Sequence, residues 1–332
     1  MDYNFFKDYF DKLDCADGIC DGTKRNYLYA LAELARHMGD RFRCEDGKVC
    51  VPEFDDVVKY VSDWTAPPQQ KARVYLGMKY WHKMHGEDKL DKQYTPLFTE
   101  EKMKQSKERA KQLSSDKEKT NWLDFKCVSR WAKTLRTRVF SWSDYRQEKL
   151  NKHQMRTLSL AFLFTYHLKY PVRNDLCTVQ YGVEPSDEIN YLDMDTHEIV
   201  FNHYKGSNKK QPVRQKMDRV MWRLFVRIRK QQSLRSKTKL ADTQGYLIVN
   251  SHMNPIKKSC MSSWLNQACK QNGVTCEDCK GRRIGTSLLR KIVITNHHKG
   301  SPSLIKNKHF AETCCMHSTE QSQLYRRIDQ ES

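Results

Sequence analysis

The sequence contains no long uninterrupted run of apolar residues. None of its apolar stretches approaches the ~20 residues that a helix needs to cross a bilayer. The first residues, MDYNFFKDYFDKLD, are acidic and lack the basic and then apolar segments of a secretory signal peptide. Because a membrane span and secretion are both disfavoured, we expect an intracellular protein. Disorder is disfavoured as well, since aromatic residues make up 11% of the chain and supply core material.

Several common catalytic motifs are also absent. The sequence has no Walker A loop, no glycine-rich dinucleotide fingerprint after a predicted strand, and no His-Glu-x-x-His motif. No cluster of acidic residues suggests a two-metal nuclease site. If the chain cuts nucleic acid, we therefore expect chemistry that uses neither a metal nor another cofactor.

Positive charge, in contrast, is abundant. Lys and Arg number 59 against 40 Asp and Glu, which gives a formal net charge of +19. Phosphate polymers are the commonest cellular polyanions, and basic side chains that bind them release counterions. The charge and the aromatic content together favour a nucleic-acid partner, and the 332 residues are enough for two domains.

The 12 cysteines are compatible with disulfides, with metal sites or with simple burial. Without a secretion signal, reduced thiols are favoured. Cys276 and Cys279 form a Cys-x-x-Cys pair, while Cys15/Cys20 and Cys44/Cys50 are spaced more loosely than most structural zinc ligands. The sequence favours free thiols at these places and leaves metal binding open.

The periodicity predicts a mainly α protein with a small antiparallel β-sheet, that is, an α+β fold. Residues 1–98 read as a compact helical domain. Residues 99–120 are almost wholly polar and carry charges of both signs, so we expect an exposed helix that runs into a charged linker. Residues 121–332 form a longer second domain.

Within the second domain, residues 153–169 are apolar nearly all round and predict a central buried helix. Residues 189–217 predict three short strands separated by turn signals. Ser318 and Gln321 fit a capping box that would start a short helix there. Further helices are expected over 218–230, 255–271 and 282–295, with a last helical pair over 303–330.

Five side chains suited to phosphoryl transfer follow one another along this domain. Arg173 comes directly after the buried helix, Lys205 lies at a hairpin tip, and Arg290 lies within an amphipathic helix. His317 precedes the capped helix, and Tyr325 lies about two turns along it. Guanidinium groups suit a phosphoryl group because their planar fork donates two bonds and stays charged. Tyr, His and Lys supply a nucleophile and groups that move protons.

In this order the five residues resemble the catalytic set of the tyrosine recombinases, the integrase family that shares its core with type IB topoisomerases. The family pattern is Arg, Lys on a β-hairpin, His-x-x-Arg, His or Trp, and a Tyr near the C-terminus. The resemblance covers about residues 120–332 and implies the DNA breaking-rejoining enzyme fold for that domain. It also implies that residues 1–98 are the family's core-binding domain.

Three segments are most similar to recombinases of virophages, large DNA viruses and eukaryotic mobile elements, namely Asn121-Trp122-Leu123, Val172-Arg173-Asn174-Asp175-Leu176 and Met316-His317-Ser318-Thr319. Two positions depart from the family pattern. Ser287, with Thr286 beside it, stands where the family has the His of His-x-x-Arg, and a hydroxyl is a poor base. Asp175 follows Arg173 by two residues, whereas the family's acid follows by three.

The resemblance implies a mechanism in which Tyr325 attacks a DNA phosphate and forms a 3′-phosphotyrosine. Arg173 and Arg290 hold the non-bridging oxygens, Lys205 is the acid for the leaving 5′ oxygen, and His317 assists. The resemblance also makes Ser287 an expected neighbour of the site. No metal and no ATP are required, because the bond energy is kept in the covalent intermediate.

The implied partner is double-stranded DNA, bound by a homo-tetramer on two sites that is a monomer or dimer when free. Integration or excision of a viral or mobile element, in the nucleus or at a site of viral DNA replication, is the expected setting. Three alternatives remain: a type IB-like topoisomerase, a catalytically silent DNA-binding relative, and a phosphodiesterase with metal ligands at Cys276 and Cys279.

Overall fold

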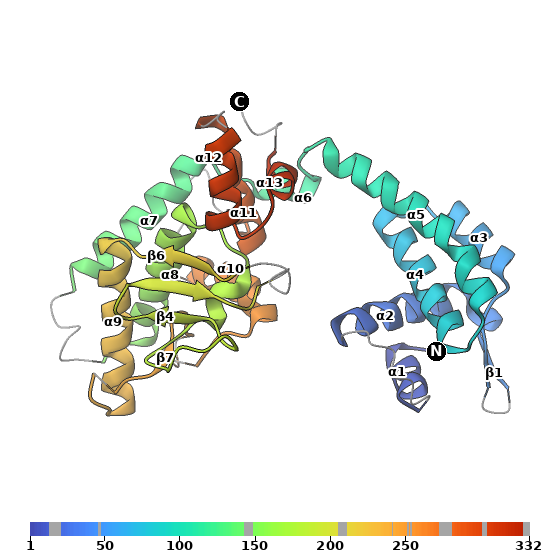
Figure 1. Cartoon of the computed structure of the whole chain (residues 1–332), viewed down its shortest axis with the longest axis horizontal. Helices are drawn as coiled ribbons and strands as arrows, with labels where there is room; N and C mark the ends of the chain where they lie inside the picture. The colour runs from blue at the N-terminus through green and yellow to red at the C-terminus, as the bar shows by residue number, and fades with distance from the viewer. Residues whose placement is uncertain are drawn as a thin grey trace. The chain divides into compact units, whose positions relative to one another are not determined.

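A computed structural model of the chain divides into two compact units, unit 1 (Met1–Lys111) and unit 2 (Gln112–Ser332), which are described separately (Figure 1). The structure describes residues 1–12, 21–45, 48–142, 149–204, 211–240, 242–250, 252, 254–271, 281–300 and 304–327. The described part is mainly α with a small sheet, which confirms the predicted α+β class. Among these residues no helix combines the length and the apolarity that crossing a bilayer requires.

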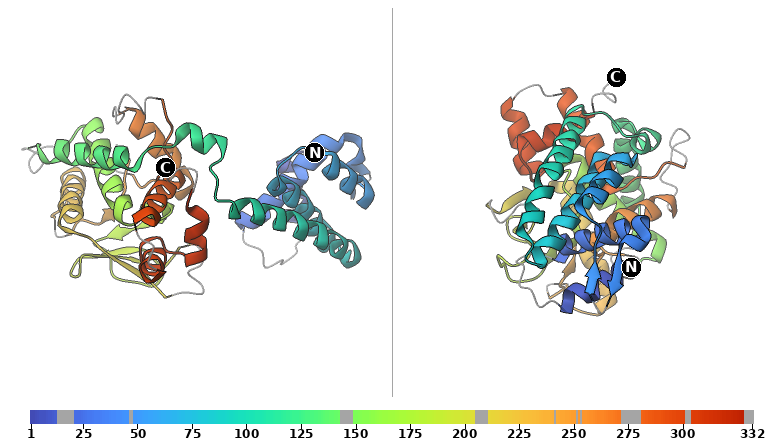
Figure 2. Two further views of the ribbon diagram at one scale, coloured as in Figure 1. Left: turned by 90° about the horizontal axis from the view of Figure 1, so that it is seen from above. Right: turned by 90° about the vertical axis from the view of Figure 1, so that its right-hand side faces the viewer.

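Unit 1 is a helical domain with one small β-hairpin that the sequence analysis does not predict. Its hairpin pairs Arg43 with Cys50 and Cys44 with Val49. The successive views in Figure 2 show its helices packed side by side. The elements are α1 (Tyr3–Lys12), α2 (Asp21–Met38), η1 (Gly39–Arg41), β1 (Arg43–Glu45), β2 (Lys48–Cys50), α3 (Phe54–Asp63), α4 (Pro68–Met84) and α5 (Asp88–Ala110).

Local signals set the helix ends of unit 1. Gly39 follows α2 with a φ of +53°, a conformation that glycine adopts without a Cβ penalty. Pro68 opens α4, where its missing N–H costs no helical hydrogen bond. Trp81 on α4 lies at the centre of the core, and its ring contacts four others, those of Phe6, Tyr9, Phe10 and His85.

Residues 99–120, expected to be an exposed helix that runs into a linker, belong partly to helix α5 and partly to helix α6 (Asp116–Asn121) in the structure. Residues up to Ala110 belong to α5, and the side chains of Glu101 and Gln105 are buried. The helix is anchored by Tyr94, whose side chain is fully buried in the core of unit 1. A polar segment is thus ordered by the apolar residues that precede it on the same helix, a contribution that the composition of 99–120 alone does not reveal.

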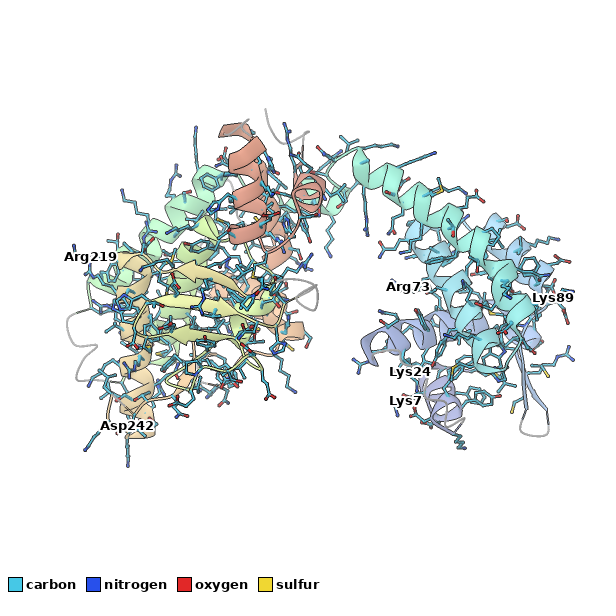
Figure 3. The ribbon with its side chains drawn as sticks, viewed as in Figure 1. Lys7, Lys24, Arg73, Lys89, Arg219 and Asp242 are labelled. Atoms are coloured by element: carbon cyan, nitrogen blue, oxygen red, sulfur yellow. The ribbon has the colours of Figure 1, made fainter. Side chains whose placement is uncertain are left out.

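Unit 2 combines helices with a five-stranded sheet. Figure 3 shows Arg219 where its long basic helix begins and Asp242 beyond the far end of that helix. The elements are α6 (Asp116–Asn121), α7 (Phe125–Phe140), α8 (Lys152–Lys169), η2 (Asn174–Thr178), β3 (Gln180–Tyr181), β4 (Tyr191–Asp193), β5 (Glu198–Phe201), β6 (Val213–Lys216), α9 (Arg219–Ser236), β7 (Gly245–Tyr246), η4 (Lys258–Cys260), α10 (Met261–Gln271), α11 (Thr286–Gly300), α12 (Leu304–His309), η6 (Phe310–Cys314) and α13 (Thr319–Tyr325).

The sheet has the strand order β6-β5-β4-β3-β7, so β6 lies at an edge. The three predicted strands are confirmed as β4, β5 and β6, and β5 pairs antiparallel with both of the others. β3 pairs parallel with β4 and antiparallel with β7. These two strands have two residues each, which is too short to give a period-2 pattern in the sequence.

The predicted buried helix is α8, and it lies at the centre of the core of unit 2. Asn151 and Gln154 form a capping box at its start, and every residue from Thr157 to His167 is buried. Figure 1 shows α8 behind the sheet and α11, α12 and α13 gathered at one end of the unit. The residues predicted to act together are carried by the segments that follow α8, by α11 and by α13.

Candidate active site

Arg173 is held at the end of a rigid element. It lies directly before η2, and its neighbours Val172 and Asp175 are buried at 0% and 1% exposure. The Arg173 side chain itself is half-buried. Its charge is close enough to Arg290 to lower the pKa of that guanidinium. The structure therefore brings together the two arginines that the sequence analysis pairs across more than 100 residues.

The first turn of α11 is fixed to the segment that follows Arg173. Thr286 Oγ1 donates to Asn174 Oδ1 at 2.6 Å, and it is also 2.7 Å from Ser262 Oγ. Asn174 Nδ2 donates to the backbone carbonyl of Lys258 at 2.8 Å. These side-chain bonds set where Arg290, one turn further along α11, lies relative to Arg173.

Arg290 is a buried cation whose hydrogen-bonding capacity is only partly used. Its side chain is 1% exposed, and Nη2 donates to the Cys315 carbonyl at 2.8 Å. Within the described residues, Nε and Nη1 have no hydrogen-bond acceptor. The pKa of Arg290 is lowered to about 10, mainly by burial and partly by the charge of Arg173, while Tyr325 acts in the opposite direction. The side chain stays charged at neutral pH, so the site presents unsatisfied cationic donors.

His317 is positioned by the turn that leads out of η6. Gln215 on β6 donates to the carbonyls of Thr313, at 2.5 Å, and Cys314, at 3.2 Å, which fixes this segment to the sheet. Met316 then adopts a φ of +55°, and the buried His317 ring donates from Nδ1 to the Ser318 carbonyl at 3.0 Å. The imidazole is thus held in one orientation.

Tyr325 is the last residue of α13, which begins at Thr319 where the capping signal predicts a helix start. Its ring stacks on His317 with centroids 5.5 Å apart and an interplanar angle of 10°. The Arg290 guanidinium carbon lies 4.6 Å from the centre of the same ring. His298 on α11 and Ser322 on α13 are 3.2 Å apart and join the two helices. Four of the five predicted catalytic side chains therefore gather at one place.

The fifth predicted catalytic residue, Lys205, and the expected neighbour Ser287 are less well defined. Lys205 lies outside the described residues, although its hairpin is closed at the base by Tyr204, whose hydroxyl donates to the Gln211 carbonyl at 3.1 Å. Ser287 is exposed on the first turn of α11, whereas its neighbour Thr286 is buried and holds Asn174. The role of Lys205 as acid and the place of Ser287 in the site stay predictions.

Two further residues near the site, Lys258 and His167, are missed by the sequence analysis. In the described contacts the fully buried Asp175 forms an ion pair with Lys258 of η4 rather than with Arg173. His167 at the end of α8 is fully buried, and its pKa is lowered to about 4, mainly by burial and partly by the charge of Arg290. No local sequence signal marks either residue, because the charged groups that they face, Asp175 and Arg290, lie more than 80 positions away in the chain.

The described residues contain no group of three or more His, Cys, Asp or Glu side chains arranged to hold a metal ion. Cys44 and Cys50 are both exposed, but the hairpin register places them on opposite faces, because Cys50 lies opposite Arg43 and Cys44 lies opposite Val49. The pair therefore does not chelate one metal. Cys15, Cys20, Cys276 and Cys279 lie outside the described residues.

Comparison with known proteins finds similarity among solved structures. The sequence matches no protein-family model and no curated protein. Among solved structures, the chain is similar to a crystal structure of XerA recombinase, with 13% sequence identity and a TM-score of 0.40. The alignment covers 99% of this chain and 94% of the other.

Proposed function

We propose that the chain is a tyrosine recombinase that cleaves and rejoins double-stranded DNA through a 3′-phosphotyrosyl intermediate. One observation carries the proposal: the Tyr325 ring lies 4.6 Å from the buried Arg290 guanidinium, two of whose nitrogen atoms lack an acceptor among the described residues. A nucleophilic side chain and unused cationic donors thus share one small volume. The order of residue types, which resembles that of tyrosine recombinases, gives this arrangement its chemical interpretation.

The incompletely bonded guanidinium favours an anion as its missing partner. A buried donor without an acceptor costs about 1–3 kcal/mol, and more when the group is charged. Arg173 adds a second positive charge near Arg290 instead of compensating the first. A phosphodiester has two non-bridging oxygens that accept hydrogen bonds and one negative charge, so it satisfies both requirements.

The proposed reaction exchanges one phosphoester bond for another. The Tyr325 oxygen forms a bond to phosphorus while the bond from phosphorus to the 5′ oxygen breaks, which leaves a 3′-phosphotyrosine and a 5′-hydroxyl. The phenol proton leaves Tyr325, assisted by His317 or by water, and Lys205 supplies a proton to the departing oxygen. Arg173 and Arg290 stabilise the charge that develops on the phosphoryl oxygens. A 5′-hydroxyl from a partner strand then reverses these steps.

In this proposal unit 2 performs the chemistry and unit 1 completes the grip on the duplex. Strand exchange between two DNA sites requires four active sites, so the proposal includes a homo-tetramer on DNA. Integration or excision of a viral or mobile element is the biological role that the sequence resemblance favours.

Covalent capture on DNA tests the proposed function. A pool of nicked duplexes with randomised sequence traps the intermediate, because the short 5′-hydroxyl fragment diffuses away after cleavage. We expect wild-type protein to form a covalent adduct and Tyr325→Phe to form none, with DNA affinity changed by no more than about twofold since only one hydroxyl is lost. An adduct that persists in Tyr325→Phe would show that another residue is the nucleophile.

Tyr246→Phe is the matched control, because this half-buried tyrosine lies on β7, at the opposite edge of the sheet from β6. We expect this variant to retain adduct formation. Relaxation of supercoiled plasmid without recombinant products would assign the same chemistry to a topoisomerase instead. Binding without any adduct in the wild type would indicate a silent DNA-binding relative.

A further inference from the structure

Glu118 is a charged residue to which the proposed reaction assigns no role. It lies on α6 and forms a capping box with Ser115: its backbone N–H donates to Ser115 Oγ, and the Ser115 N–H donates to Glu118 Oε2, both at 3.3 Å. α6 is the first helix of unit 2, directly after the boundary at residues 111 and 112. The Glu118 carboxylate is therefore bonded to the segment by which the chain leads into unit 2.

The same carboxylate contacts two cations beside the proposed site. Oε2 accepts from Arg327 Nε at 3.0 Å, and Oε1 forms an ion pair with Lys291. Lys291 directly follows Arg290 on α11, and Arg327 comes two residues after Tyr325. Figure 1 shows α6 next to α11 and α13. We call Glu118, Lys291 and Arg327 the Glu118 cluster.

The side chains of the cluster are largely removed from water. Glu118 is 18% exposed, Lys291 17% and Arg327 11%. Partly buried ion pairs are screened less by salt than exposed ones, and removing one partner is costly because the others lose one counter-charge. The nearby Arg290 and Arg173 are also positive. Loss of the carboxylate would therefore remove a negative charge from a region of several positive charges at the end of α13.

Arg327 joins the cluster to the last turn of α13. Its Nη1 donates to the Leu324 carbonyl at 3.0 Å, and its backbone N–H donates to Thr295 Oγ1 on α11 at 3.0 Å. A cation at a helix C-terminus also interacts favourably with the helix dipole. The Arg327 side chain thus closes the turn that carries Tyr325, and Glu118 holds that Arg in place.

We propose that Glu118 is a positioning residue that fixes the end of α13, and with it Tyr325, against α11. Through the capping box it also connects the position of Tyr325 to the path of the chain between units 1 and 2. The inference rests on the proposed function, because it concerns the placement of the proposed nucleophile. Reacting groups must come within ~3–3.5 Å, and a displacement of about 1 Å can lower a rate by ~10²-fold.

The test compares variants of the full chain by two measurements, the single-turnover rate of adduct formation on the nicked duplexes and the hydrogen exchange of the amides of residues 319–327 without DNA. Glu118→Gln keeps an oxygen for the capping box but removes the charge. We expect it to lower the cleavage rate by ~10-fold or more, to leave the DNA Kd within about threefold, and to speed exchange in α13. Asp116→Asn, an exposed change on the same helix, should alter neither measurement.

A double-mutant cycle separates positioning from general folding. If Glu118 acts through Arg327, we expect Arg327→Gln alone to lower the cleavage rate and to speed α13 exchange as well, and Glu118→Gln combined with Arg327→Gln to lose little more than the larger of the two single changes. Unchanged exchange and cleavage in Glu118→Gln would overturn the inference, as would losses that simply multiply in the double variant. If the wild type forms no adduct but α13 exchange still rises in Glu118→Gln, the proposed function fails while the positioning contact is supported.

Discussion

The two units differ in how they treat charge. Unit 1 contains 20 Lys and Arg and 20 Asp and Glu, whereas unit 2 contains 39 and 20, so the whole net charge of +19 belongs to unit 2. In unit 1 many of these charges form ion pairs with one another. Lys7 and Lys24, both labelled in Figure 3, contact Asp11, and Lys104 contacts Glu100. Long-range attraction to a polyanion is therefore a property of unit 2.

The cores of the two units also differ in the polar and charged groups that they bury. The core of unit 1 is built around Trp81 and its stacked aromatic neighbours, and the buried polar atom without a partner among its described residues is the neutral Tyr94 hydroxyl. Among the described residues of unit 2, the buried Arg290 is a cation with donors that lack an acceptor, and it lies next to the half-buried ring of Tyr325. Buried groups whose bonding is incomplete mark places where a structure is arranged for a ligand rather than for stability alone. This difference is what the proposed function requires, because it assigns the chemistry to unit 2.

The largest effect on stability is expected in unit 1. Trp81→Ala removes a side chain that is 2% exposed and leaves a cavity among four rings, so we expect unit 1 to lose about 3–5 kcal/mol of unfolding free energy. Denaturant unfolding followed by hydrogen exchange in each unit measures this loss. Amides of unit 2 should keep their protection, and an equal loss of protection in both units would show that the two do not unfold independently.

In unit 2, replacing the buried Arg290 should lower the cleavage rate without lowering the stability of the fold. Arg290→Met should lower the cleavage rate by ~10²–10³-fold, as loss of an oxyanion donor does. Without DNA it should not destabilise the fold: the lowering of the Arg290 pKa to about 10 corresponds to roughly 3 kcal/mol of cost for the buried charge. Part of the gain is offset by the lost bond to Cys315. Lys270→Met, an exposed change on α10, is the control. A strongly destabilised Arg290→Met protein would contradict the comparison.

A pH-dependent contribution is expected from His167. Its pKa is about 4 in the folded chain and near 6.5 when unfolded, so below pH 6.5 the unfolded state binds a proton that the folded state does not. The free energy of unfolding should therefore fall as pH falls from about 6.5 to about 4, by at most roughly 3 kcal/mol from this residue. His167→Leu should flatten this slope, and His153→Gln, exposed on the same helix, should not. Parallel slopes in wild type and His167→Leu would contradict the assignment.

The smallest expected effect concerns salt. A pocket of about 560 Å³ on unit 2 is lined by Lys126, Lys299 and other cations. Replacing these two lysines by Gln should make the slope of log affinity against log salt shallower by about one to two, because each phosphate contact contributes ~0.9. Replacing Lys89 and Lys92, exposed on α5 of the neutral unit, should change the slope by less than about half as much. Equal changes would place unit 1 in equal electrostatic contact with DNA.

The sequence predicts the local features of this molecule well. The apolar run at 153–169 predicts α8, the turn signals predict the β5–β6 hairpin, and the capping signal predicts where α13 begins. Each of these depends on residues a few positions apart. The order of the five candidate residues, which resembles that of the tyrosine recombinases, also predicts that Arg173, Arg290, His317 and Tyr325 meet.

Apart from the meeting of these four residues, contacts between distant segments were not predicted. β3 and β7 are too short to have a pattern, and the pairing of Asp175 with Lys258 or of Glu118 with Arg327 joins residues 83 and 209 positions apart. The choice between Thr286 and Ser287 likewise depends on the direction in which α11 faces Asn174. These features follow from the packing of whole elements, which periodicity and spacing do not encode.

The most direct test of the account is to identify the residue that becomes joined to DNA. Adducts trapped on nicked duplexes can be digested with protease and nuclease, and the nucleotide-bearing peptide sequenced by mass spectrometry. The account expects the phosphodiester on the Tyr325 oxygen, in a peptide from the end of α13, with phosphorus attached to a 3′ oxygen. A modification on any other residue, or phosphorus attached through a 5′ oxygen, would contradict it.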